Sequence, residues 1–327
     1  MTKVITIGSA TMDVFVECDK ANIVSVCSKD KNSEFMSYPY GSKIDITEFS
    51  TNVGGGGINT ACNLANLGFD TAAIFKVGDD IYSDGIFSFC KDKNINLTNV
   101  IQDKSISTGF SIILVSFQGD RTVLAHRGAN AKIEFDEINL DAVKDADFIY
   151  IAPMNGESNF ALEPLAEFAY KNDTIICLNA GTTSLKSGFS KLKKILKYAT
   201  VVVLNKEEAM MATGIEVRPD TKTEKFSHDL IHVDIKKMMK SLQVKDSQVI
   251  IITDGKLGAY AYYNNNYYFC PVFPSDVVST LGAGDAFAST LCAAYSRTHD
   301  LGKCLMYASV NSSSVVSKFS ATEGLLT

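Results

Sequence analysis

Residues 279–290 read Ser-Thr-Leu-Gly-Ala-Gly-Asp-Ala-Phe-Ala-Ser-Thr, with Gly282 and Gly284 just before Asp285 and an apolar, helix-like run after it. Glycines allow a turn to point its backbone N–H groups inward, and a helix start adds unpaired N–H groups and partial positive charge. Such a turn can bind an anion beside a carboxylate, which suits phosphoryl transfer with Asp285 as the base. The alternative is a plain glycine turn into a helix, with Asp285 favourable in the first turn.

The composition indicates an ordinary soluble globular protein. The chain has 327 residues, 46% hydrophobic and 21% charged. Its net charge of −6 and the lack of a Lys/Arg-rich run disfavour a nucleic-acid partner. No apolar run reaches the ~18 residues of a membrane span, and no signal-peptide pattern precedes the first strand-like run. The eight cysteines show no metal-ligand spacing, so we expect reduced thiols in a cytoplasmic protein without a membrane partner.

Short β-branched runs alternate with helix-length segments along the chain. The candidate strands are residues 4–8, 72–77, 110–117, 148–152, 174–178, 200–204 and 249–253. The candidate helices are residues 58–67, 83–93, 158–170, 230–242, 285–295 and 301–318. Most of the strands are continuously apolar, which is typical of strands covered on both faces. This pattern predicts an α/β fold with a mainly parallel central sheet, helices on both faces and ligands at the carboxyl ends of the strands.

Two segments interrupt this alternation. Residues 13–51 are polar and lack a helical stripe, and residues 105–127 look like two strands around a Gly119-Asp120 turn. Extended segments that leave the main sheet can form a small β lid, which excludes water from a kinase site. We therefore predict a body of residues 1–12, 52–104 and 128–327 and a β lid of residues 13–51 and 105–127. The alternative is that both segments are ordinary surface excursions.

Polar and glycine-rich positions follow the first strand. Asp13 can bind sugar hydroxyls from this position, or it can simply serve a turn or a helix cap. A second glycine cluster, Gly54-Gly55-Gly56-Gly57, lies shortly before Asn59. Without side chains the cluster lets a ligand approach the backbone, and Asn59 can donate and accept hydrogen bonds. The alternative for the cluster is a flexible linker between lid and body.

Two further motifs follow later strands. Asn205 and Glu208, after strand 200–204, could orient Mg²⁺ or its waters at the phosphates of ATP. An Asn and a Glu three residues apart at a helix start are equally typical of a capping box. The turn Thr253-Asp254-Gly255-Lys256-Leu257-Gly258 joins two extended runs and could hold a nucleotide by backbone contacts. A hairpin turn is the alternative for that segment.

The order of these motifs resembles the ribokinase family, also called the PfkB carbohydrate kinases. The motifs that carry the resemblance are Asp13, the loop Gly54–Asn59, the pair Asn205 and Glu208, the turn Thr253–Gly258, and Gly-Ala-Gly-Asp-Ala-Phe at 282–287. His-Arg-Gly-Ala-Asn at 126–130 also looks like the family's segment on re-entry from the lid. The resemblance spans nearly the whole chain, from Gly8 to Gly324.

The resemblance implies ATP-dependent phosphorylation of an alcohol, with Mg²⁺ and ATP as cofactors. By motif, Asp285 would be the catalytic base. The backbone amides that would form the anion hole belong to Gly282, Ala283, Gly284 and Asp285. The residues that would hold the substrate are Asp13, Gly55, Gly56 and Asn59. Glu208 would act on the metal, and the residues that would hold the nucleotide are Asn205, Thr253, Gly255, Gly258 and Asn311.

Three features depart from the family pattern. The family commonly has an Asp at the position of Ser279, where it helps to bind a monovalent cation. Ser279 brings no charge, and Ser320 stands where a glycine is common in the same cation loop, so both positions weaken the case for activation by K⁺. The segment between Asp13 and Gly54 is longer than in typical ribokinases. For that reason the resemblance does not carry a particular sugar over to this chain.

We therefore expect a cytoplasmic Mg²⁺-ATP-dependent kinase of a sugar or small polyol, acting on a primary hydroxyl. One alternative is a nucleoside kinase of the same fold, in which lid aromatics stack on a base instead of packing in a lid core; these are Phe15, Phe35, Tyr38 and Tyr40. The other alternative is a non-catalytic sugar-binding regulator, although a pure binder has no need of a base. The open edges of a lid sheet also suit a homodimer.

Overall fold

A computed structural model describes residues 1–18, 20–27, 32–116, 121–218 and 231–327. The predicted Gly119-Asp120 turn and the first residue of the predicted helix 230–242 lie outside the described residues.

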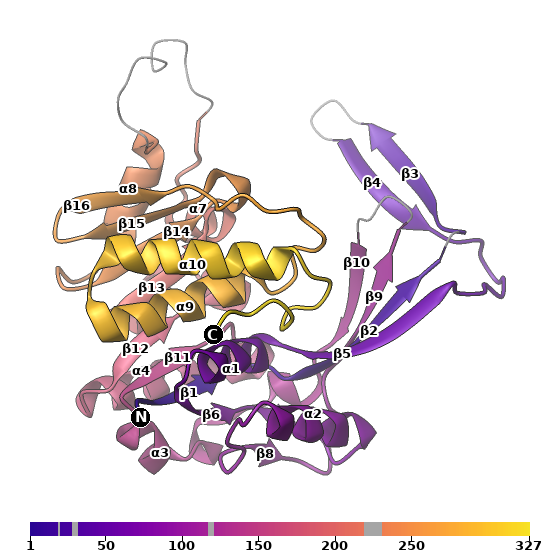
Figure 1. The fold of residues 1–327 in the computed structure, drawn as a ribbon, viewed down its shortest axis with the longest axis horizontal. Helices are drawn as coiled ribbons and strands as arrows, with labels where there is room; N and C mark the ends of the chain where they lie inside the picture. The colour runs from indigo at the N-terminus through magenta and orange to yellow at the C-terminus, as the bar shows by residue number, and fades with distance from the viewer. Residues whose placement is uncertain (19, 28–31, 117–120, 219–230) are drawn as a thin grey trace.

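An eight-stranded sheet runs through the body in the order β16-β15-β14-β13-β12-β11-β1-β6 (Figure 1). The strands from β6 to β14 are parallel to one another, whereas β15 and β16 are antiparallel and close one edge. This confirms the predicted α/β class with a mainly parallel sheet. The strands are β1 (Lys3–Ile7), β6 (Asp70–Ile74), β11 (Phe148–Ile151), β12 (Ile175–Leu178), β13 (Val201–Asn205), β14 (Val249–Thr253), β15 (Ala259–Tyr263) and β16 (Asn266–Cys270).

Helices cover both faces of this sheet, because alternate residues of each strand point to opposite sides. Phe148 and Tyr150 of β11 pack on the side of α1 (Gly56–Asn66), α9 (Ala283–Thr298) and α10 (Leu301–Val316). Ile149 and Ile151 of the same strand pack on the opposite side. The helices on that side are α3 (Leu140–Asp145), α4 (Leu162–Lys171), α5 (Gly181–Lys186), α6 (Phe189–Leu196), α7 (Lys206–Thr213) and α8 (Val233–Leu242).

A separate four-stranded sheet, in the order β10-β9-β2-β5, stands beyond the edge of the body, and a hairpin of two strands extends from it (Figure 1). The four strands are β2 (Thr11–Glu17), β5 (Glu48–Gly54), β9 (Phe110–Val115) and β10 (Arg121–His126). The hairpin consists of β3 (Asn22–Cys27) and β4 (Asn32–Ser37). Because β2 begins only four residues after β1 ends, this second sheet is attached directly to the carboxyl end of β1.

The chain returns from the second sheet to the body through a tight turn. Gly128 has φ +49°, and a Cβ there would lie 2.3 Å from the carbonyl oxygen of Ser107. Two residues later, the Asn130 side chain accepts a hydrogen bond from the backbone N–H of Ala10 (2.9 Å) and donates one to its carbonyl (2.7 Å). The buried Asn130 therefore ties the return point to the segment between β1 and β2.

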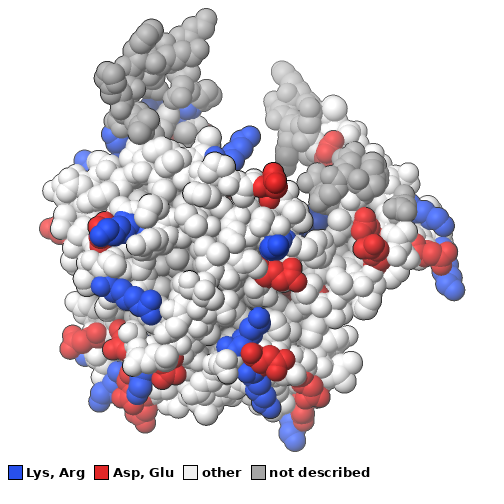
Figure 2. Space-filling model, viewed as in Figure 1, with Lys and Arg blue, Asp and Glu red and all other residues white. Residues whose placement is uncertain are grey.

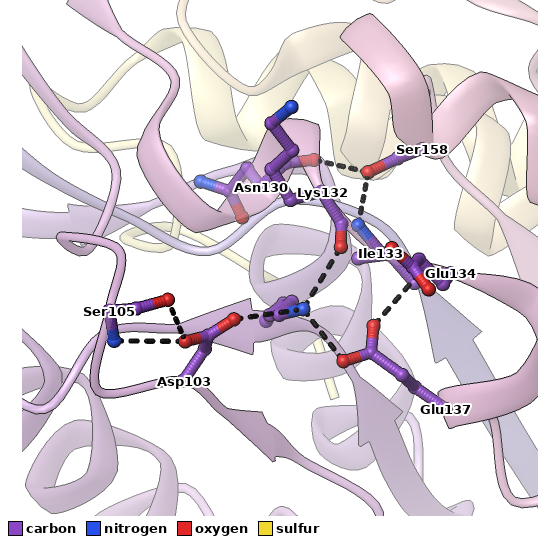
Figure 3. Close-up of polar contacts among 9 residues, drawn as sticks. Asp103, Ser105, Asn130, Lys132, Ile133, Glu134, Glu137 and Ser158 are labelled. Carbon is purple, nitrogen blue, oxygen red and sulfur yellow. Dashed lines mark hydrogen bonds and ion pairs between the residues drawn. The ribbon is translucent and has the colours of Figure 1, made fainter.

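A buried lysine stabilises the same region. Lys76, in the short strand β7 (Lys76–Val77), is 4% exposed and donates to the carbonyl of Lys132 (3.0 Å) and the carboxylate of Glu137 (2.7 Å). Asp103 lies 3.3 Å from the same ammonium (Figure 3). Burial acts to lower the pKa of Lys76, but hydrogen bonds to Glu137 and Asp103 outweigh it and raise that pKa above its ordinary value. The ammonium is therefore charged at neutral pH, which a buried lysine requires partners to sustain.

Charges on the molecular face of Figure 2 are mixed, with acidic and basic side chains interspersed across it. Among the described residues no helix is long and apolar enough to cross a bilayer. Between β6 and the return point lies helix α2 (Ile81–Asp92), which begins at a capping box formed by Asp80 and Ser83. The short strand β8 (Ile101–Gln102) then pairs with β7.

Candidate active site

Two helix N-termini meet beside the carboxyl end of β1. Helix α1 follows Gly55, with φ +97°, and helix α9 follows Gly282, with φ +76°; both conformations favour glycine. In the first turn of α1, Asn59 donates from Nδ2 to Oδ2 of Asp285 in the first turn of α9 (2.8 Å). The structure thus brings together two predicted motifs that lie 226 residues apart in the sequence.

Close packing, and not flexibility, explains the glycine cluster before α1. A Cβ on Gly54 would lie 2.3 Å from Oδ2 of Asp13, and one on Gly55 would lie 2.5 Å from the carbonyl oxygen of Ser9. A Cβ on Gly57 would lie 2.9 Å from the carbonyl carbon of Gly8. The linker alternative is therefore wrong for this segment. The cluster is a packed turn between the second sheet and α1.

The turn contacts both predicted carboxylates. Asp13 lies against Gly54, and a Cβ on Gly56 would lie 3.7 Å from Oδ1 of Asp285. Asp13 is 9% exposed and pairs in register with Asn52 of β5 and Ser111 of β9. Burial raises the pKa of Asp13, although hydrogen bonds from Ser111 and Thr11 act in the opposite direction.

Asp285 has an environment suited to a general base. Burial raises the pKa of its carboxyl group above the ordinary value, and the hydrogen bond from Asn59 opposes that rise. A carboxylate whose pKa lies closer to neutrality removes a hydroxyl proton more effectively. The same hydrogen bond fixes one carboxylate oxygen and leaves the other, Oδ1, on the side of Gly56.

The start of α9 opens into a cavity of about 130 Å³. A Cβ on Gly284 would meet nothing within 4 Å, whereas one on Gly282 would lie 2.5 Å from Cβ of Ala321. The open space therefore lies on the Gly284 side of the helix start, where the unpaired amides of a first turn can meet an anion. The lining residues are Thr253, Gly255, Gly258, Ala259, Val272, Ala283, Gly284, Phe287, Ser309, Ser312 and Ser313.

Three of the predicted nucleotide residues, Thr253, Gly255 and Gly258, thus lie in the wall of one cavity with two residues of the predicted anion hole. Gly258 has φ +104°, and a Cβ there would lie 2.3 Å from the carbonyl oxygen of Cys270. The turn Thr253–Gly258 therefore joins β14 to β15 in a conformation that favours glycine. It is a hairpin connection between antiparallel strands, and it also lines the cavity.

Asn205 and Glu208 form the capping box at the start of α7. The Asn205 side chain accepts from the backbone N–H of Glu208 (2.8 Å), and Glu208 Oε2 accepts from the N–H of Asn205 (3.0 Å). Burial raises the pKa of Glu208. The described residues contain no group of three or more His, Cys, Asp or Glu side chains placed to hold a metal ion. Mg²⁺ bound through waters, phosphates and a single carboxylate is compatible with that arrangement.

Asn311 does not join the other predicted nucleotide residues. It is 2% exposed, and its Nδ2 donates to Asn63 (2.7 Å) and Thr290 (2.7 Å), while its Oδ1 accepts from the N–H of Leu326 (2.9 Å). All of these contacts are internal, so the side chain serves the packing of α1, α9 and α10. The residues of α10 that line the cavity are instead Ser309, Ser312 and Ser313, whose i, i+3, i+4 spacing places them on one helix face.

Two further polar residues near the site, Tyr150 and Asn179, were not predicted from the sequence. Asn59 Oδ1 is buried without a hydrogen-bond partner among the described residues. The buried Tyr150 hydroxyl and the Asn179 side chain face each other, and this contact acts to lower the pKa of Tyr150. Burial raises the pKa of Tyr150 well above its ordinary value, with a smaller contribution from the Asp285 carboxylate. Leaving a buried polar atom unpaired costs about 1–3 kcal/mol, so such atoms are typical of sites that a ligand or water completes.

Comparison with known proteins identifies the family of this chain. The model of the pfkB family of carbohydrate kinases matches residues 1–327. The chain belongs to the pfkB family of carbohydrate kinases. The family assignment confirms the predicted enzyme class, an ATP-dependent carbohydrate kinase, and the predicted family resemblance.

Relatives of this pfkB chain include sugar kinases. It is 26% identical to a 5-dehydro-2-deoxygluconokinase of Geobacillus thermodenitrificans over 305 residues, 91% of this chain and 87% of that protein. The structure of Arabidopsis thaliana ribokinase complexed with ribose and ATP matches it with a TM-score of 0.78 at 19% identity, over 100% of this chain and 96% of that one. A Methanocaldococcus jannaschii nucleoside kinase matches with a TM-score of 0.77 at 20% identity, over 100% of this chain and 95% of that one. These likenesses establish the ribokinase-like fold.

Replacing Gly54 with alanine should weaken sugar binding in a protein that still folds. The new Cβ displaces the Asp13 carboxylate, and loss of a charged hydrogen bond of this kind raises KM for the sugar by about 10- to 100-fold. The KM for ATP should stay unchanged, because the cavity at Gly284 does not include Gly54. The control is Gly302→Ala in α10, where the nearest atom is a side-chain oxygen at 3.4 Å. An unchanged sugar KM in the Gly54 variant would contradict the prediction that Asp13 binds the sugar.

Proposed function

We propose that this carbohydrate kinase transfers the γ-phosphoryl group of ATP to a hydroxyl of a sugar or small polyol, with Asp285 as the general base. The observation that carries the proposal is the Asn59–Asp285 hydrogen bond. It holds a buried carboxylate with a raised pKa at a helix start that opens into a cavity. A base beside an anion-binding helix start is the arrangement that phosphoryl transfer to an alcohol requires.

In the proposed step, Asp285 removes the proton from the substrate hydroxyl. The hydroxyl oxygen forms a bond to the γ-phosphorus while the bond from that phosphorus to the β,γ-bridging oxygen breaks. ADP leaves, and the proton resides on Asp285 until solvent takes it. The backbone amides of Gly282, Ala283, Gly284 and Asp285 stabilise the charge that develops on the transferring phosphoryl group.

The substrate site lies along the packed glycine turn. Asp13 accepts hydrogen bonds from sugar hydroxyls, and the sugar lies against the backbone of Gly55 and Gly56. Asn59 has a further role there, because its Nδ2 already binds Asp285 while its Oδ1 is buried without a partner among the described residues. A substrate hydroxyl that donates to Asn59 Oδ1 would supply that partner and lie beside the base.

The nucleotide site lies along the cavity at the start of α9. Thr253, Gly255 and Gly258 bind the nucleotide through their backbone and through the threonine hydroxyl. Asn205 and Glu208 hold the metal or its waters at the phosphates. When bound, Mg²⁺ neutralises phosphate charge as the bond to the leaving group breaks. We place this reaction in the cytoplasm, where thiols stay reduced, which fits the eight free cysteines.

The second sheet acts as the lid of this site in our proposal. Its residues Phe15 and Ile113 are buried, so the face that they share with Asp13 packs toward the body. Of the four aromatics expected in a lid core, Phe15 packs 4.9 Å from Phe319, whereas Phe35 and Tyr40 are exposed. Closure over the bound sugar would exclude water and limit hydrolysis of ATP.

A homodimer through the lid is part of the same proposal. The strands β5 and β10 are the edges of the second sheet, and Phe49 on β5 is 61% exposed. The hairpin adds exposed apolar side chains at Val24, Val26 and Phe35. Sheet edges and apolar residues left exposed together are typical of an interface between copies. Sedimentation velocity should give a dimer at micromolar concentration, and a monomer under those conditions would contradict this part.

Turnover should depend on Asp285. The assay measures ADP release across a panel of sugars, polyols and nucleosides, and the best acceptor is then used with Asp285→Asn. Loss of the base should lower kcat by about 10²–10⁴-fold while circular dichroism shows an unchanged fold. The control is Asp173→Asn, which makes the same chemical change at an exposed residue beyond α4.

Each outcome of that experiment decides one part of the proposal. Near-wild-type turnover by Asp285→Asn would remove the residue from catalysis. A nucleoside as the best acceptor would favour the second candidate function, a nucleoside kinase, which the likeness to the Methanocaldococcus jannaschii enzyme keeps open. Turnover with sugars and none with nucleosides is the result that we expect.

A further inference from the structure

An arginine of the second sheet reaches the turn that precedes the anion-binding helix start. Arg121, the first residue of β10, donates from Nη1 to Ser279 Oγ (2.7 Å) and from Nη2 to Thr280 Oγ1 (2.7 Å). Thr280 stands two residues before Gly282. The guanidinium thus lies on the same turn that leads into the proposed anion hole, although it comes from a different sheet.

The turn does not depend on Arg121 for its shape. The backbone N–H groups of Val278 and Ser279 both donate to the carbonyl of Val316 at the end of α10 (2.8 and 3.1 Å). Ser279 Oγ also accepts from the N–H of Leu281 (3.2 Å). Because these bonds hold the turn from within the body, the guanidinium can leave it without unfolding it.

Arg121 belongs to the face of the second sheet that carries the proposed substrate residue. It pairs in register with Val115, and Val115 pairs with Glu17 of β2. Alternate residues of a strand share a face, so Glu17 lies on the same side of β2 as Asp13. The side chain of Arg121 therefore projects into the space between the second sheet and the body.

The groups near the cavity leave the negative charge of a bound nucleotide only partly compensated. Asp285 follows the cavity-lining residue Gly284 and is a carboxylate, as is Glu208 at the start of α7. Lys206, in the same turn as Glu208, forms an ion pair with Asp254. The amides of the helix start carry only partial charge. A nucleoside triphosphate adds several negative charges to this region, so a full positive charge near Thr280 would stabilise it.

We propose that Arg121 is a phosphate-binding residue that the second sheet contributes to the nucleotide site. With nucleotide bound, the guanidinium exchanges the hydroxyl oxygens of Ser279 and Thr280 for non-bridging oxygens of the terminal phosphates. The exchange is favourable because charge-assisted bonds to phosphate are about twice as strong as bonds to neutral acceptors, and the planar guanidinium can bind two oxygens at once. Bound ATP is thereby linked to both the second sheet and the body. This inference rests on the proposed nucleotide site.

The test separates phosphate binding from a purely structural bridge between sheet and body. Calorimetry measures the affinity of wild type, Arg121→Ala and Arg121→Lys for a non-hydrolysable ATP analogue and for adenosine. Removing two charge-assisted bonds should weaken binding of the analogue by about 10- to 100-fold and leave adenosine binding unchanged. Lysine keeps the positive charge but lacks the planar guanidinium that binds two oxygens at once, so we expect an intermediate loss of affinity for the analogue. The matched control is Arg297→Ala, which removes an exposed arginine that donates to the carbonyl of Leu67.

Equal losses for the analogue and for adenosine would show a structural bridge and overturn the proposal, as would no loss for either ligand. Circular dichroism and thermal melting check that each variant folds. Failure of the proposed function has a different signature, since wild-type protein would then bind neither ligand or would transfer phosphate to no sugar. Wild-type turnover together with an unaffected Arg121→Ala variant would overturn this inference alone.

Discussion

The contact between α1 and α9 is the constraint on which the site depends. It is a row of buried hydrogen bonds: Asn59 to Asp285 (2.8 Å), Asn63 to Ser289 (2.7 Å), and Asn63 to Thr290 (2.8 Å). Asn311 of α10 extends the row by donating to Asn63. Buried amides are costly unless every partner is in place, so the row has one favourable register. That register determines where Asp285 lies relative to the glycine turn.

The other features of the site follow from this helix contact. Helix α1 can lie against α9 only if the turn before it passes close to β1, and that turn has no room for side chains at Gly54, Gly55 and Gly57. The same closeness removes water from Asp285 and raises the pKa of its carboxyl group. A buried acid is unfavourable for stability but useful for catalysis, which is a common conflict at active sites. The row of hydrogen bonds stabilises the helices that hold it.

Features that depend on local sequence pattern could be predicted from the sequence. Continuous apolar runs predicted the parallel strands, and glycines before Asp285 and Asn59 predicted the two helix starts that meet. The predicted helices did not include α3, α5, α6 or α7, although the capping box of Asn205 and Glu208 that starts α7 was one of the two interpretations of that pair. The helix α4 starts later than predicted, since residues Gly156–Ala161 form a 3₁₀ turn.

What could not be predicted depends on contacts between distant segments. The family resemblance implies that Asn311 binds the nucleotide, but its side chain donates to Asn63 of α1 and Thr290 of α9 and accepts from the N–H of Leu326 near the C-terminus. Tyr150 lies in an apolar strand, and nothing local shows that its hydroxyl is buried near Asp285. The role proposed for Arg121 depends on its hydrogen bonds to Ser279 and Thr280, which lie about half of the chain away in the sequence. The partners of these residues come from distant segments of the chain, so their roles could be inferred only from the folded structure.

The most direct test of the account is the pH dependence of kcat at saturating sugar and ATP, in wild type and in Asn59→Ala. In the proposed mechanism the carboxylate form of Asp285 is the active base, so turnover should fall at acidic pH through a pKa above the ordinary value for an aspartic acid. Asn59 stabilises the charged form, so its removal should raise that pKa and move the acid limb to higher pH. Superimposable acid limbs in the two proteins, or turnover that does not fall with acid, would contradict the central role given to this hydrogen bond.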